Sequence, residues 1–71
     1  MRIRLREVRL RKVLTQEELA QRSGVAEATI SRIESGQQEA RISTVRKLAA
    51  ALGVEPGELV VQESTDTKRA A

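Results

Sequence analysis

The chain has 71 residues, a net charge of +3, 39% hydrophobic residues, and no Phe, Trp, Tyr, Cys or His. A chain of this length forms one small domain, and without Cys or His it has neither disulfides nor the usual zinc ligands. Acid–base and nucleophilic catalysis draw mainly on the same missing side chains, so we expect no enzyme, no cofactor and no metal.

Basic residues are concentrated at the start of the sequence. Residues 1–12 hold six of the thirteen Lys and Arg residues against one acid, Glu7; the six are Arg2, Arg4, Arg6, Arg9, Arg11 and Lys12. This concentration suits a polyanion, either a nucleic acid or an anionic membrane. The alternative is a solvated helix face whose long Arg side chains cover apolar surface. Without a Trp or Phe anchor, membrane binding is the weaker interpretation.

The longest apolar run is LAAALGV, from Leu48 to Val54. It is far shorter than the ~20 residues needed to cross a bilayer. The apolar residues near the N-terminus alternate with charges, unlike those of an export signal. We therefore expect a cytoplasmic protein without membrane contact.

Residues 3–13 form the first predicted helix. Leu5, Val8 and the stem of Lys12 trace a helical stripe, and Arg and Leu are good helix formers. The alternation of apolar and basic residues also suits a strand, but the stripe favours a helix.

The second predicted helix starts at a capping box. Thr15 is followed three residues later by Glu18, and Leu14 and Leu19 stand where a hydrophobic staple packs. The helix is expected to end near Gly24, where a left-handed backbone is easily adopted.

The third predicted helix follows this turn directly. Ala26 takes its N-cap position but has no capping oxygen, and Gly36 marks its end. A polar loop, QQEAR, leads to a fourth helix that ends at Gly53, and Glu55-Pro56 then begins a short fifth helix. Their apolar residues repeat at helical spacing: Ile42, Val45, Leu48, Ala49 and Leu52 in the fourth helix, and Leu59 and Val60 in the fifth.

These elements predict an all-α fold of five short helices in one domain, residues 1–61. Residues 62–71 show no apolar period, and we expect them to form a flexible C-terminal tail.

The second and third helices are separated by a short turn that contains Gly24. Two short helices joined in this way describe a helix-turn-helix. Because the turn is too short for the helices to lie antiparallel, they cross steeply and the outer face of the third helix protrudes. A protruding helix fits the ~12 Å-wide major groove of B-DNA.

The segment TQEELAQRSGVAEATISRIESG resembles the helix-turn-helix of the phage repressor and Cro family, also called the xenobiotic-response-element family. The resemblance covers roughly residues 5–60 and includes LREVR before this segment and KLAAALGVEPGEL after it. It implies a lambda-repressor-like fold and sequence-specific binding of double-stranded DNA. A prokaryotic or phage transcriptional regulator, most often a repressor, is the function that it implies. Relatives often carry Gly where Val13 stands, Ser or Thr at Ala26, and Pro at Ala40.

The resemblance also implies which residues meet the bases. Glu27, Ala28, Ser31 and Arg32 match the base-facing positions of the recognition helix. The helical period selects the same residues, because they fall within one ~140° arc opposite Ile30 and Ile33. Arg32 is the best candidate for a guanine contact, against the alternative of a phosphate or solvent arginine. The role of Glu27 has three alternatives. Its carboxylate accepts a hydrogen bond from cytosine N4, stabilises the first turn through the helix dipole, or disfavours binding to other sequences by repelling phosphates.

Other positions are assigned by the resemblance to phosphate contact or to structure. Gln16 matches a phosphate-contacting position at the start of the second helix, where anions bind well, and Thr15 caps the same turn. The loop after the third helix holds three further candidates for phosphate contact, Gln37, Gln38 and Arg41. Glu39 lies in the same loop, and its negative charge weakens this assignment. Arg9 and Glu34 match a partly buried salt bridge between the first and third helices.

We expect a homodimer that reads a pseudo-palindromic operator. Its candidate interface residues are Leu52, Leu59, Val60 and Val61, although an ordinary small core would use several of them too. The alternative function is a protein-interaction module of the same fold, an antitoxin or adaptor, which binds a partner protein instead of DNA.

Overall fold

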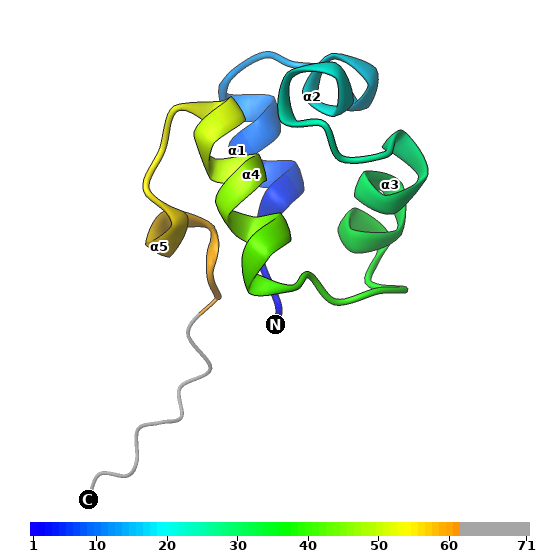
Figure 1. Ribbon diagram of the computed structural model, residues 1–71, viewed down its shortest axis with the longest axis vertical. Helices are drawn as coiled ribbons and strands as arrows, with labels where there is room; N and C mark the ends of the chain where they lie inside the picture. The colour runs from blue at the N-terminus through cyan, green and yellow to red at the C-terminus, as the bar shows by residue number, and fades with distance from the viewer. Residues whose placement is uncertain (62–71) are drawn as a thin grey trace, which may run out of the picture.

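The computed structural model describes residues 1–61, and the predicted flexible tail at 62–71 lies outside the described residues. The described part confirms the all-α prediction and its five helices (Figure 1). These are α1 (Leu5–Arg11), α2 (Gln16–Ser23), α3 (Glu27–Ser35), α4 (Ile42–Leu52) and α5 (Pro56–Leu59).

The helices enclose a core of aliphatic side chains. Those with less than 2% of their surface exposed are Leu5, Leu19, Ile30, Leu48, Leu59, Val8 and Val45, and every helix contributes at least one of them. α4 packs against α2 and α5, while α3 packs against α2 and α1. α3 therefore lies at one side of the molecule, as its place at the right of Figure 1 shows.

The first helix is shorter than predicted at both ends, because Ile3 and Arg4 precede it and Lys12 and Val13 form the turn that follows it. The Arg4 backbone N–H donates to the carbonyl oxygen of Leu59 at 2.7 Å, and the Val61 N–H donates to the carbonyl oxygen of Arg2 at 3.0 Å. Ile3 and Val60 form an antiparallel bridge between these two bonds. Backbone pairing with this distant segment replaces the first predicted helical turn, which explains why the helix begins at Leu5 and not at Ile3.

Ile42 was expected on the buried stripe of the fourth helix, but 57% of its surface is exposed. It is the first residue of α4, where the helix has not yet entered the core. The buried stripe begins one turn later, at Val45.

The capping box at the start of α2 is confirmed. The Thr15 hydroxyl accepts a hydrogen bond from the Glu18 backbone N–H at 3.0 Å, and the Thr15 N–H donates to a Glu18 carboxylate oxygen at 2.9 Å. At its other end α2 stops at Gly24, whose φ of 77° is left-handed. Both ends of α2 are thus set by residues of the predicted types, which determines where α3 can begin.

Val13 adopts a left-handed backbone with a φ of 58° between α1 and α2. A β-branched residue is strained in this region, because its side chain crowds the following carbonyl group. The side chain is 85% exposed, so packing offers little compensation. The turn between α1 and α2 requires a left-handed backbone at position 13, and the Val13 side chain disfavours it.

We predict that Val13→Gly raises the free energy of unfolding by about 0.5–1 kcal/mol. The relief of roughly 1–2 kcal/mol of backbone strain exceeds the entropic cost of glycine. Urea denaturation measures the change. Ala50→Gly in α4 is the matched control, because glycine on an exposed position of a helix lowers stability by roughly 0.5–1 kcal/mol. A loss of stability in both variants would contradict the strain at Val13.

Candidate nucleic-acid interface

A buried ion pair fixes α3 to α1. The Arg9 Nε donates to Glu34 Oε2 at 2.6 Å, and Arg9 Nη2 donates to Glu34 Oε1 at 3.0 Å. Their side chains are only 9% and 4% exposed. Hydrogen bonding to Glu34 raises the pKa of Arg9 above its ordinary value, against the opposing effect of burial. This bidentate geometry is the strongest form of a guanidinium–carboxylate contact.

The same pair also holds the beginning of α2. Arg9 Nη1 donates to the backbone carbonyl of Leu14 at 2.6 Å, and Gln16 Nε2 donates to Glu34 Oε1 at 3.0 Å. Gln16 is half-buried, and its side chain is oriented by this bond. Its backbone N–H lies in the first turn of α2, where N–H groups have no partner within the helix. Gln16 and Thr15 therefore sit at an ordered helix start suited to an anion.

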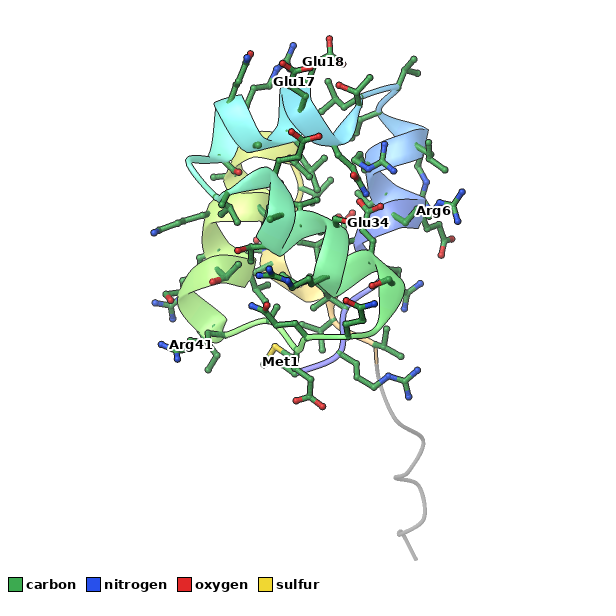
Figure 2. All side chains as sticks on the ribbon, turned by 90° about the vertical axis from the view of Figure 1, so that its right-hand side faces the viewer. Met1, Arg6, Glu17, Glu18, Glu34 and Arg41 are labelled. Atoms are coloured by element: carbon green, nitrogen blue, oxygen red, sulfur yellow. The ribbon has the colours of Figure 1, made fainter. Side chains whose placement is uncertain are left out.

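The four residues predicted to face the bases lie together on the exposed side of α3. Glu27, Ala28, Ser31 and Arg32 are all exposed, whereas Ile30 and Ile33, on the opposite side, are 0% and 7% exposed. The Arg32 guanidinium makes no hydrogen bond or ion pair with the residues described. Figure 2 faces this side of the molecule, with α3 in front.

The start of α3 is the weaker end of this helix. Ala26 makes no side-chain cap, as expected from its missing oxygen. At the C-terminal end the backbone carbonyl groups have more hydrogen-bond partners. Gly36 is left-handed there, and the Arg32 carbonyl accepts from the N–H groups of Gln37 and Gln38 at 2.9 and 3.3 Å. The exposed face therefore depends on tertiary contacts more than on its own cap.

The loop after α3 exposes Gln37, Gln38 and Arg41. Its acidic residue, Glu39, accepts a hydrogen bond from the N-terminal ammonium of Met1 at 2.8 Å, and this contact lowers the pKa of Glu39 below its ordinary value. The negative charge that weakened the assignment of this loop is thus paired. The loop is also tied to Met1 by the Ala40 N–H, which donates to the Met1 carbonyl oxygen at 3.1 Å.

Two of the four residues assigned to a dimer interface lie inside the subunit. Leu52 and Leu59 are 4% and 0% exposed and belong to the core, so the expectation that they face a partner is wrong. The apolar period marks burial but does not distinguish a core from an interface. Val60 and Val61 are half-buried at the edge of the N-terminal pairing.

Within residues 1–61 no helix is long and apolar enough to cross a membrane. The described residues also include no group of three or more acidic side chains arranged to hold a metal ion. The predicted contact residues carry guanidinium, amide and hydroxyl groups, which bind anions and hydrogen-bonding edges, together with one carboxylate, that of Glu27.

Comparison with known proteins agrees with this geometry. A family model described as helix-turn-helix matches residues 5–59. The chain belongs to this family, of the Cro/C1 type. The match spans all five helices, so the helix-turn-helix assignment covers the whole described core and not only α2 and α3.

Curated relatives of this helix-turn-helix chain include two bacterial proteins. It is 38% identical over 63 residues to the cryptic phage CTXphi transcriptional repressor RstR of Vibrio cholerae, covering 89% of this chain and 57% of that protein. It is 47% identical over 51 residues to the uncharacterized HTH-type transcriptional regulator RghRB of Bacillus subtilis strain 168, covering 70% of this chain and 37% of that protein. The chain thus spans about half the length of these relatives or less.

Solved structures of similar helix-turn-helix proteins extend the likeness to three dimensions. The restriction-modification controller protein C.AhdI from Aeromonas hydrophila is 44% identical, with a TM-score of 0.77 and coverage of 80% of this chain and 86% of that chain. The hypothetical transcription factor NHTF from Neisseria is 34% identical, with a TM-score of 0.75 and coverage of 82% and 67%.

We predict that Glu34→Gln lowers the free energy of unfolding by about 3 kcal/mol, because it leaves the buried Arg9 charge uncompensated. Glu7→Gln is the matched control: Glu7 pairs with Arg11 on the surface at 3.3 Å, and exposed pairs contribute at most ~1 kcal/mol. Urea denaturation of both variants measures the difference. Equal effects would contradict the structural role assigned to Glu34.

Proposed function

We propose that this chain binds double-stranded DNA sequence-specifically and regulates transcription as a repressor. The observation that carries the proposal is the exposed face of α3. This face exposes the unpaired Arg32 guanidinium, and the ion pair between Arg9 of α1 and Glu34 of α3 holds the helix in position. The names of RstR and RghRB, a transcriptional repressor and a transcriptional regulator, support the same class of function.

In this proposal α3 enters the major groove of B-DNA. Arg32 donates two hydrogen bonds to the O6 and N7 atoms of a guanine, the commonest specific contact. Ala28 is small enough to allow close approach and its methyl group meets a thymine methyl. Ser31 bonds a base edge only where the helix lies close, and Glu27 accepts from cytosine or disfavours other sequences.

Phosphate contacts position α3 in the groove. The backbone N–H groups at the start of α2, together with Gln16 and Thr15, bind one phosphate. The exposed loop residues Gln37, Gln38 and Arg41 bind the backbone beyond the end of α3. Such contacts hold the register of the helix without reading the sequence.

We further propose that two copies bind a pseudo-palindromic operator. Two α3 helices would occupy successive major grooves about 34 Å apart, and bound protein would occlude polymerase. Val60 and Val61 are the remaining candidates for the contact between copies, since Leu52 and Leu59 are buried. This is a binding function without catalysis, and it would act in the cytoplasm, where a prokaryotic genome lies.

A salt titration with duplex DNA tests the proposed function. We expect binding at low salt, with log K falling by about 0.9 per log unit of salt for each phosphate neutralised. Fluorescence anisotropy with a random-sequence duplex measures this slope. The absence of duplex binding at low salt would refute the proposal and favour the protein-interaction module.

We predict that Arg32→Ala weakens binding to the preferred sequence by about 1–3 kcal/mol and relaxes the choice of one base pair in each half-site. Selection from a random duplex pool, carried out with both proteins, measures sequence choice and half-site symmetry together. Arg22→Ala is the matched control, because Arg22 is an exposed arginine on α2 without a hydrogen bond or ion pair to the residues described. An unchanged base preference in Arg32→Ala would exclude Arg32 from base recognition.

A further inference from the structure

We propose that Arg6 on α1 binds a phosphate of the DNA strand that passes one side of α3, while Arg41 binds the other strand. The proposal rests on the proposed function and extends it to a residue that neither the helical period nor the resemblance assigned to DNA. It predicts which arginine meets which of the two backbones that border the groove.

The first observation is a notch of about 260 Å³ where α1, the start of α2, and α3 meet. It is lined by Arg6, Arg9, Gln16, Ser31, Glu34 and Ser35. This lining includes one residue expected to contact a phosphate, Gln16, and one expected to face a base, Ser31. A DNA backbone that reaches Gln16 while α3 lies in the groove must therefore pass the mouth of the notch.

The second observation is the charge balance of the notch. Arg9 and Glu34 neutralise each other, and their side chains are almost completely buried. Arg6 is exposed and makes no hydrogen bond or ion pair with the residues described. The neighbouring acid, Glu7, is occupied by Arg11. Arg6 is thus the cation that gives the notch a net positive charge.

The lining also offers donors suited to a phosphate. The Ser31 hydroxyl has no hydrogen-bond partner among the described residues, and the Gln16 backbone N–H is in the unpaired first turn of α2. An arginine beside such donors binds a phosphate with two parallel hydrogen bonds. Arg6 complements the α2 start, which supplies hydrogen bonds but no formal positive charge.

The third observation is the arrangement around α3. In Figure 2, Arg6 and Arg41 lie on opposite sides of this helix, and the Glu34 side chain extends from α3 on the side where Arg6 lies. The acidic residues Glu17 and Glu18 lie at the top of this view, away from both arginines, and the Glu18 carboxylate is held by the Thr15 N–H at the start of α2. A helix seated in the major groove has one phosphate backbone on each side. The positions of the two arginines match the two backbones.

The test compares Arg6→Gln with Arg11→Gln by anisotropy on the operator obtained from the selection. Both variants remove one positive charge from α1, but residues 6 and 11 point about 140° apart around the helix. We expect Arg6→Gln to reduce the salt slope by about 0.9 for each phosphate that it no longer neutralises and to weaken binding to operator and unrelated duplex by similar factors. Arg11→Gln and Arg6→Lys should retain the wild-type slope.

Phosphate ethylation interference then assigns the strands. We expect Arg6→Gln to abolish interference at phosphates of one backbone and Arg41→Gln to abolish it at phosphates of the other. Thermal unfolding of Arg6→Gln should match wild type, because the side chain is exposed. Equal salt slopes for Arg6→Gln and Arg11→Gln, or effects at the same phosphates for Arg6→Gln and Arg41→Gln, would overturn this inference while leaving the proposed function intact. Failure of the wild-type protein to bind any duplex would overturn both.

Discussion

The position of the exposed helix depends on one buried carboxylate, that of Glu34. It accepts from Arg9 on α1 and from Gln16 at the start of α2, while Arg9 also holds the carbonyl of Leu14. Three helices therefore meet at one charge-assisted network. In a poorly solvated site each member must be satisfied, because removal of one partner leaves a buried charge or polar group unpaired. The network thus couples the stability of the fold to the placement of α3 relative to the start of α2.

The basic residues of this chain divide into two kinds by their surroundings. Arg9 forms a buried ion pair with Glu34, whereas Arg6 and Arg32 are exposed and have no partner among the described residues. The net charge of +3 conceals this division. For recognition of a polyanion, the placement of uncompensated charges around α3 matters more than their number, because phosphates border the groove on two sides.

Much of the fold could be predicted because its signals are local. The Thr15 cap, the Gly24 and Gly36 ends, and the stripe from Val45 are patterns within a few residues. The errors have non-local causes. Extended pairing with Leu59 and Val61 shortens the first helix, and core packing removes Leu52 and Leu59 from the predicted interface. The exposed face of α3 could be predicted because the helical period places its residues opposite Ile30 and Ile33. Arg6 carries no local signal that separates it from the other five basic residues of the first twelve positions.

The sequence by itself determined the helices, most of their ends, and the side of α3 that faces out, since apolar period and caps act over one or two turns. The pairing of Arg9 with Glu34 came from family resemblance, because a separation of 25 residues carries no local signal. Tertiary structure alone decided that residues 2–4 pair with 59–61, that Glu39 forms an ion pair with the Met1 ammonium, and that Arg6 lines the same notch as Gln16 and Ser31. Each of these depends on which distant side chains share a surface or a backbone ladder after the core has packed. Packing therefore decides which charges remain available for binding.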